Sequence, residues 1–191
     1  MKFSYFINVI RSDAFRYSGK TNFLNIIKLY FRIAGFNYSC KMRLTLFLSQ
    51  HLFVKPLFIV SYFLYRRAMY KYGICIPYKT KIGKGLYIGH FGGIVINSDV
   101  VIGKNCNISH GVTIGEKPSK GARSCPIIGD NVYIGANSTI VGDIRLGSQC
   151  VVGANAFVDK SVREDEVVVG VPARHLSFAS SADYVHNTWN E

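Results

Sequence analysis

Aliphatic residues recur at every sixth position through the second half of the chain. A glycine often follows directly, as in Ile88–Gly89 and Ile134–Gly135. The period has a two-residue slip before Ile102 and a longer interruption before Ile128. The twelve in-phase positions are Ile82, Ile88, Ile94, Ile102, Ile108, Ile114, Ile128, Ile134, Ile140, Leu146, Val152 and Val158. This hexapeptide repeat predicts a parallel β-helix, in which three short strands form one coil and each inward aliphatic residue is covered by its stacked neighbours.

The first 72 residues have helical spacing instead. Apolar residues at i, i+3 and i+4 predict a helix that is capped by Thr21 or Asn22 and ended by Gly35. Two further helices are expected at 42–53 and 57–72. The fold class is therefore mainly β, with an α-helical region at the N-terminus.

The chain divides into three parts on this pattern. A helical region is expected at 1–73, a β-helix at 74–176 and a polar tail at 177–191 that we expect to be poorly ordered. The interruption at 116–126 is polar and contains no inward aliphatic residue. It predicts an eight-residue loop inserted at one turn, and loops that project from rigid scaffolds often carry function.

Charge and aromatic residues are unevenly distributed. The net charge is +12, and residues 1–84 hold fifteen of the 23 Lys and Arg residues, 19 of the 26 aromatic residues and only one acidic residue, Asp13. This composition fits a helical bundle packed on the first coil. It also fits an interfacial surface for an anionic membrane or a phosphate-bearing acceptor. Nucleic acid is not expected as a partner, because no recognition motif accompanies the charge.

The number of cysteines and the length of the apolar runs indicate in which cellular compartment the protein is expected. Five cysteines, an odd number without paired spacing, predict reduced thiols in the cytoplasm. The apolar run after Lys2 is too short for a signal peptide, and the run from Leu52 to Leu64 is too short to span a bilayer. We therefore expect a cytoplasmic protein, with peripheral contact at the inner face of the membrane as the further expectation from the N-terminal composition.

The repeat also aligns candidate functional residues. Once the slip and the loop are allowed for, the residues two positions beyond Ile88, Ile108, Ile134 and Val152 form a column. Its members are His90, His110, Ala136 and Ala154. A long thin ligand could lie along the alanines and present its reactive end to an imidazole, which is a suitable general base at neutral pH. If the loop instead conceals a whole hexapeptide, Asp130 rather than Ala136 would follow His110.

Four segments resemble a known family. They are 88–96 (IGHFGGIVI), 110–115 (HGVTIG), the Cys125-Pro126 pair that closes the loop, and 171–174 (VPAR). They resemble the serine acetyltransferases among the hexapeptide-repeat acyltransferases, over about 76–176. The resemblance is closer still to relatives that O-acetylate bacterial capsule and exopolysaccharide sugars, such as the colanic-acid acetyltransferases. The resemblance implies a left-handed parallel β-helix that uses acetyl-CoA as co-substrate and no metal. It also implies a homotrimer with active sites between subunits, and it leaves open whether two trimers pair.

The resemblance also suggests roles for single residues. His90 falls on the family's catalytic histidine, and Ala136 and Ala154 fall on positions that line the pantetheine channel. Basic residues that could meet the CoA phosphates, or could simply be solvated, are Lys160, Arg163 and Arg174. His110, Tyr78 or a backbone carbonyl would orient His90. Tyr78 and Cys125 are the candidate acceptor-binding residues, and Cys125 is not expected to be a nucleophile.

Several acceptor-side positions depart from the serine acetyltransferases. Cys75 stands where that family has an aspartate that orients the histidine, and Gly89 stands where it has another acid. Ser124-Cys125 stands where it has Arg-His. Because those groups bind a small zwitterion, we expect the acceptor to be a sugar hydroxyl of a capsule or exopolysaccharide precursor.

Four alternatives remain open. Two are acetylation of serine for cysteine synthesis and N-acetylation of an amino sugar nucleotide. The third is a metalloenzyme similar to γ-carbonic anhydrase. Such a site would need three protein ligands for the metal, and His51 and His175 lie outside the repeat, which leaves two histidine candidates. The fourth is a non-catalytic scaffold.

Overall fold

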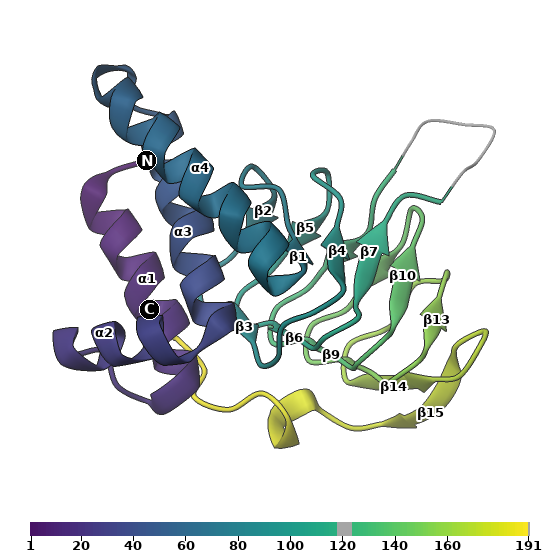
Figure 1. The fold of residues 1–191 in the computed structure, drawn as a ribbon. Helices are drawn as coiled ribbons and strands as arrows, with labels where there is room; N and C mark the ends of the chain where they lie inside the picture. The colour runs from purple at the N-terminus through teal and green to yellow at the C-terminus, as the bar shows by residue number, and fades with distance from the viewer. Residues whose placement is uncertain (118–123, 191) are drawn as a thin grey trace.

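A bundle of helices covers one end of a prism of stacked coils. The computed structural model describes residues 1–117 and 124–190, so part of the expected loop, 118–123, lies outside the described residues (Figure 1). The helices are α1 (Phe3–Ser18), α2 (Phe23–Arg32), α3 (Ala34–Ser49) and α4 (Lys55–Tyr72), with a 3-10 turn η1 (Leu52–Val54) before α4. The prism is a left-handed parallel β-helix, as the repeat and the resemblance predicted.

Three parallel sheets form the faces of the prism. Their strand orders are β1-β4-β7-β10-β13, β2-β5-β8-β11 and β3-β6-β9-β12-β14-β15, in which only the β14–β15 pair is antiparallel. The strands are β1 (Ile74–Cys75), β2 (Lys81–Ile82), β3 (Tyr87–Ile88), β4 (Ile94–Ile96), β5 (Val101–Ile102), β6 (Asn107–Ile108), β7 (Thr113–Gly115), β8 (Ile127–Ile128), β9 (Tyr133–Ile134), β10 (Thr139–Val141), β11 (Arg145–Leu146), β12 (Val151–Val152), β13 (Phe157–Val158), β14 (Glu166–Val169) and β15 (Arg174–Phe178). A second 3-10 turn, η2 (Ser181–Asp183), follows.

The register confirms the predicted eight-residue insertion. Ile128 pairs with Ile102, and Ile134 pairs with Ile108. These inward side chains are almost fully buried, because each coil covers the apolar face of the next.

The predicted position of the two-residue slip is wrong. Ile88 pairs with Ile108, but Ile96 rather than Ile94 pairs with Ile114. The two extra residues therefore lie between Ile88 and Ile96, directly after His90. Ile94 is nevertheless buried, because it stacks on Ile74 of the preceding strand β1.

The helical region differs from the prediction mainly at α3. Asn22 caps α2 as expected, since its side chain accepts a hydrogen bond from the N–H of Asn25 at 2.9 Å. Gly35, expected to end that helix, instead lies inside the first turn of α3, which runs on to Ser49. The reason is close packing: a Cβ atom at Gly35 would lie 2.2 Å from the carbonyl oxygen of Ile88.

Polar side chains of α1 and α3 attach the helices to the first coil. Asp13 is fully buried and accepts hydrogen bonds from Ser39, Arg43 and the N–H of Leu86. Arg43 also donates to the carbonyl oxygens of Ile82 and Gly83. The one acidic side chain of the basic region is thus the centre of this junction.

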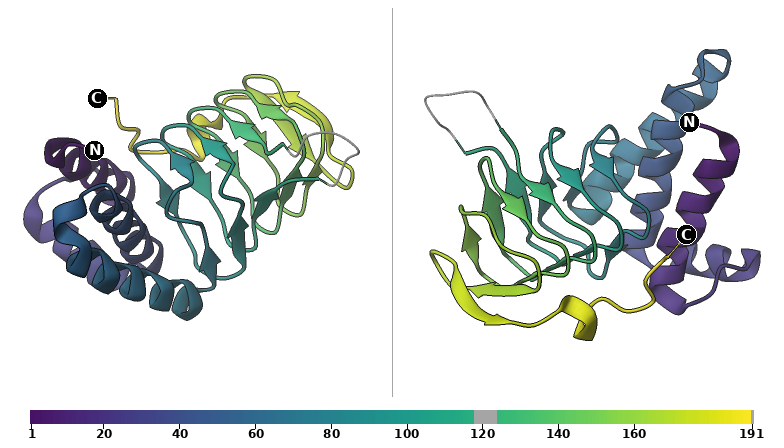
Figure 2. Two further views of the ribbon diagram at one scale, coloured as in Figure 1. Left: turned by 90° about the horizontal axis from the view of Figure 1, so that it is seen from above. Right: turned by 180° about the vertical axis from the view of Figure 1, so that it is seen from behind.

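The C-terminal segment is not the loose tail that its polar composition suggested. Figures 1 and 2 show it running back beside the coils to the helical region. Asn105 and Trp189 share two hydrogen bonds, and the ring of Trp189 packs edge-on against Phe15. Arg16 donates to the carbonyl oxygen of His186 at 2.9 Å. These contacts with distant residues hold the segment in place.

The packing at Gly35 predicts a loss of stability in Gly35→Ala. Helix propensity alone would favour alanine by about 1 kcal/mol. Overpacking against Ile88 should outweigh it and lower the free energy of unfolding by about 1–3 kcal/mol, measurable by denaturant unfolding.

Gly115→Ala is the matched control, because the nearest atom to its Cβ would be 3.8 Å away. Equal stability of Gly35→Ala and the wild type would contradict the close approach of α3 to β3.

Candidate active site

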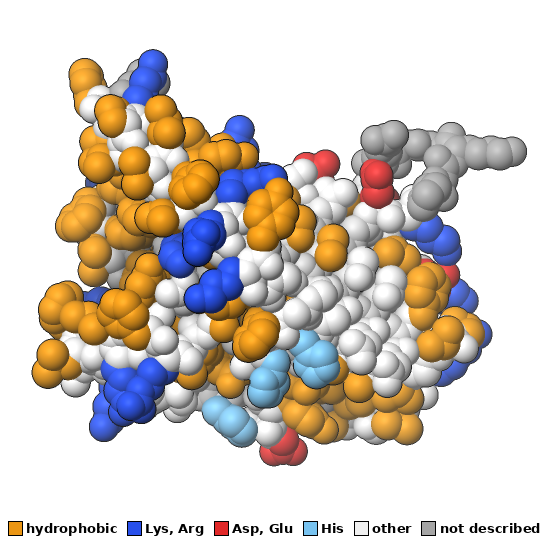
Figure 3. All heavy atoms as spheres, viewed as in Figure 1, with side chains coloured by type: hydrophobic (Ala, Val, Ile, Leu, Met, Phe, Trp, Pro, Cys, Tyr) orange, Lys and Arg blue, Asp and Glu red, His pale blue; other side chains and the backbone are white. Residues whose placement is uncertain are grey.

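Two histidines lie one above the other on consecutive coils. His90 follows β3 and His110 follows β6, two strands that pair through Ile88 and Ile108. Their ring centroids are 6.1 Å apart, with the ring planes at 82°. Both side chains are exposed, and Figure 3 shows histidine side chains gathered on one face of the molecule. An acceptor hydroxyl could therefore reach an imidazole directly from solvent.

The predicted column continues over the next two coils. Ile134 pairs with Ile108, and Val152 pairs with Ile134. Ala136 and Ala154 consequently follow His110 along the same edge, which excludes the alternative alignment with Asp130. The backbone links the members: the N–H of Asn137 donates to His110 and that of Asn155 donates to Ala136, at 2.9 and 2.8 Å. The small side chains leave this edge open to a ligand.

The coil containing His90 widens directly after the histidine. The two-residue insertion includes Gly92 and Gly93, whose φ angles of 107° and 68° favour glycine. The carbonyl oxygen of Gly92 accepts a hydrogen bond from the N–H of Gly111 at 2.8 Å. Phe91 is 60% exposed, and its ring lies 6.2 Å from that of Tyr72. The sequence revealed the slip but not that it borders the candidate base.

The helical region supports the strand that precedes His90. The Tyr17 hydroxyl accepts from the N–H of Ile88 at 3.0 Å and donates to its carbonyl oxygen at 3.2 Å. Burial raises the pKa of Tyr17, so the hydroxyl keeps the proton that it donates. Gly35 packs on the same carbonyl group. Sequence reasoning missed this role of Tyr17, because no local pattern connects residues 71 positions apart.

His110 and Tyr78 are the side chains proposed to orient His90. In the structure the His110 ring lies beside the His90 ring. Tyr78 instead makes ring contacts with Phe58, Tyr62 and Tyr65, beside α4. Within the described residues, the ring nitrogens of both site histidines lack a hydrogen-bond partner. Acceptor binding by Tyr78 stays a prediction.

The candidate CoA-phosphate residues lie at the far end of the prism. Lys160 and Arg174 line a cavity of about 240 Å³ together with Glu166 and His175. Arg163 is engaged elsewhere: its Nε lies 3.3 Å from Glu166, and its guanidinium group lies over the ring of Phe178. Lys160 and Arg174 are therefore better placed than Arg163 to meet a phosphate.

In residues 1–117 and 124–190, no three His, Cys, Asp or Glu side chains form a group that could hold a metal ion.

Comparison with known proteins assigns the family. Residues 125–160 match the family described as bacterial transferase hexapeptide (six repeats). The structure is similar to the serine acetyltransferase of Neisseria gonorrhoeae in complex with serine, with a TM-score of 0.73 and 30% identity, over 92% of this chain and 70% of the other. This chain belongs to the serine acetyltransferase-like hexapeptide-repeat transferases.

Other relatives agree with this assignment. The serine acetyltransferase of Staphylococcus epidermidis (strain RP62A) is 44% identical over 100 residues, which are 52% of this chain and 47% of that protein. The coenzyme A complex of the serine acetyltransferase from Brucella abortus has a TM-score of 0.74 at 26% identity, covering 93% of this chain and 69% of the other. The chain spans about a third to a half of the length of the curated relatives that it matches.

The expected sugar acceptor is wrong. The matched relatives are serine acetyltransferases in both sequence and structure, and the closer resemblance to capsule and exopolysaccharide enzymes is not supported. The prediction relied on the replacement of a few acceptor-side residues at Cys75, Gly89 and Ser124-Cys125. The structural similarity, in contrast, covers 92% of this chain.

The two unusual cysteines of this family member have different surroundings. Cys125 is half-buried against the core. Its burial, together with the charges of Asp99 and Glu116, raises the pKa of its thiol. Cys75 is exposed on β1. A raised pKa leaves little thiolate at neutral pH, so Cys125 is poorly suited to nucleophilic attack.

We predict that iodoacetamide at neutral pH labels Cys75 of the native protein before Cys125. Cys106 and Cys150 should stay unlabelled, because both are fully buried and burial raises the pKa of each thiol to about 12. Mass spectrometry of timed samples measures the order, and denatured protein is the control, in which all sites become accessible. Faster labelling of Cys125 than of Cys75 would show an activated thiol.

Proposed function

We propose that the protein is an acetyl-CoA-dependent O-acetyltransferase whose acceptor is the hydroxyl group of serine. The observation that carries the proposal is the column itself, with an exposed histidine pair at one end and small residues along the adjoining edge. The relatives are serine acetyltransferases, which suggests serine as the acceptor, and the relative in complex with coenzyme A supports the donor.

The chemistry follows from the order of groups along the edge. The acetyl-CoA arm lies along Ala154 and Ala136, which places its thioester near the histidines. His90 takes the proton of the serine hydroxyl as that oxygen attacks the thioester carbonyl. The tetrahedral intermediate then collapses, the carbon–sulfur bond breaks, and the imidazolium returns its proton to the departing thiolate. The products are O-acetylserine and CoA.

His110 acts on His90 rather than on the substrate in this scheme. Its ring is nearly perpendicular to that of His90 and limits the orientations that the base can adopt. Tyr17 and Gly35 hold the preceding strand from the other side. The base is thus positioned by contacts from two directions.

The departures at Gly89 and Ser124 affect serine binding, whereas the departure at Cys75 removes a carboxylate that would orient His90. None of these residues carries a formal charge to pair with the ammonium or carboxylate group of serine. A charge-assisted hydrogen bond contributes about 1.5–3 kcal/mol, so the KM for serine should be high.

Assembly into a homotrimer, and the pairing of trimers, stay predictions. A neighbouring copy would close the alanine edge, which is exposed at Ala154 in the single chain.

The first experiment follows release of CoA and formation of O-acetylserine with wild type, His90→Gln and His110→Gln. We expect turnover with serine and none with glycine, which lacks the hydroxyl. His90→Gln should lower kcat by about 10²–10⁴-fold, and His110→Gln should lower it less.

No turnover of serine by the wild type, even at concentrations near its solubility limit, would overturn the proposal. Turnover by His90→Gln at the wild-type rate would remove His90 as the base.

The alanine edge predicts a selective effect of Ala154→Leu on acetyl-CoA. A leucine side chain would intrude on the bound arm and raise the KM for acetyl-CoA roughly tenfold. The kcat should change little, because His90 is not altered.

Glu164→Leu is the matched control. Glu164 stands two residues beyond Val162, which bridges to Leu146, so it occupies the equivalent corner of a different edge. Equal effects of both substitutions would argue against binding along the alanines.

A further inference from the structure

The outer side of α4 exposes large apolar side chains. Phe63 and Ile59 are 67% and 65% exposed, and Phe53 in the preceding turn is fully exposed. The remaining apolar members of this surface are Leu57, Val60 and Leu64. Apolar patches of this kind on soluble proteins mark sites of interaction. Figure 1 shows that this end of α4 projects away from the β-helix, so the patch can meet a partner without obstruction from the coils. We call it the α4 outer surface.

Basic side chains continue this surface toward the C-terminal end of the helix. Arg66, Arg67 and Lys71 line a groove of about 530 Å³ together with Phe63 and Tyr70. Arg66 donates to the Tyr70 hydroxyl at 2.6 Å and lies over its ring. Figure 3 shows basic side chains beside hydrophobic ones over the helical region. Guanidinium groups bind phosphate oxygens, and tyrosine favours the boundary between apolar and aqueous surroundings.

The helical region has no exposed acidic side chain that would offset the positive charge of this surface. Asp13 is the one acidic residue among the first 84, and it is fully buried against Arg43. A second copy of the chain would present the same uncompensated charge, and like charges face to face oppose association. The charge therefore favours an anionic partner over self-association.

The shape of the surface favours a membrane over a folded protein. Phe63 borders the basic groove, but Leu57, Val60 and Leu64 are exposed along the projecting helix itself (Figure 1), where they can enter a lipid surface together. No helix within the described residues is long and apolar enough to cross a bilayer. A helix with an apolar face and flanking cations can instead lie in the interface, where its apolar residues enter the acyl boundary and its cations contact lipid phosphates.

We propose that the α4 outer surface docks the protein on an anionic lipid membrane as a peripheral contact. The apolar half of α4 inserts shallowly, and Arg66, Arg67 and Lys71 bind the headgroup phosphates. This contact is independent of acetyl transfer, because the histidine column lies on the β-helix.

The test is flotation of the chain of residues 1–191 with lipid vesicles. We expect binding to phosphatidylcholine vesicles that contain phosphatidylglycerol, and much weaker binding to phosphatidylcholine alone. Arg66→Glu/Arg67→Glu should lower the partition coefficient at least about tenfold, since two groups that attract the anionic surface are replaced by two that it repels. Ile59→Ser/Phe63→Ser tests insertion and should reduce the binding that remains at high salt.

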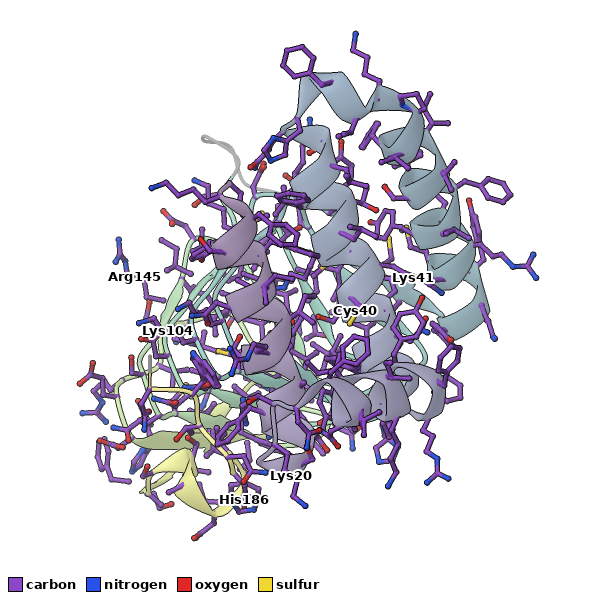
Figure 4. The ribbon with its side chains drawn as sticks, turned by 90° about the vertical axis from the view of Figure 1, so that its left-hand side faces the viewer. Lys20, Cys40, Lys41, Lys104, Arg145 and His186 are labelled. Atoms are coloured by element: carbon purple, nitrogen blue, oxygen red, sulfur yellow. The ribbon has the colours of Figure 1, made fainter. Side chains whose placement is uncertain are left out.

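The matched control is Lys104→Glu/Arg145→Glu, which changes the net charge by the same amount. Figure 4 shows both residues beside the coils, on the side of the molecule away from α4, and both are exposed. This control should bind within about twofold of wild type, consistent with screening of distant charges. Circular dichroism and thermal melts should be unchanged in all three variants, because the substituted side chains lie outside the core.

Three results would overturn the proposal. The first is a wild type that does not float with anionic vesicles. The second is an equal loss in the control, which would indicate general electrostatic attraction without a docking face. The third is dissociation of an oligomer by the α4 substitutions in the absence of lipid, which would make this surface a contact between copies.

Discussion

The buried carboxylate of Asp13 joins the two halves of this protein. It accepts hydrogen bonds from Ser39 and Arg43 of α3 and from the backbone N–H of Leu86 in the first coil. Breaking a buried charge pair of this kind typically costs about 3–5 kcal/mol, because the remaining charge is left without a partner. The end of a β-helix is an open set of strand edges and apolar side chains, and this network holds the helices over it.

The same junction determines how the candidate base is held. His90 belongs to the first coil, which has a neighbouring coil on one side only. On its other side α1 and α3 take the place of a coil, through the hydrogen bonds of Tyr17 with Ile88 and the close approach of Gly35. The helical region therefore supports the site as well as protecting the end of the stack. The strand register then places Ala136 and Ala154 along the same edge as the histidines.

Charge is divided between the two halves in a way that fits both proposals. The β-helix is nearly neutral and carries the histidine column, whereas the helical region is strongly basic and exposes the α4 outer surface. Acetyl transfer requires an open edge along the coils, and membrane docking requires a projecting face beside them. Because the two proposed surfaces use different elements, we expect substitutions on one to leave the function of the other unchanged.

The six-residue period determined the coils, the eight-residue insertion and the alignment of His90, His110, Ala136 and Ala154, because a β-helix repeats one local conformation and its register is a matter of counting. Counting could not locate the two-residue slip, because Ile94 and Ile96 are both aliphatic and either could be the inward residue of the repeat; both are in fact buried. It also missed the start of α3 at Ala34, the role of Tyr17 and the packed C-terminal segment. Those features depend on contacts between residues far apart in sequence, such as Gly35 with Ile88 and Trp189 with Asn105. Only the tertiary structure brings such residues together, because neither partner has a local pattern that identifies the other.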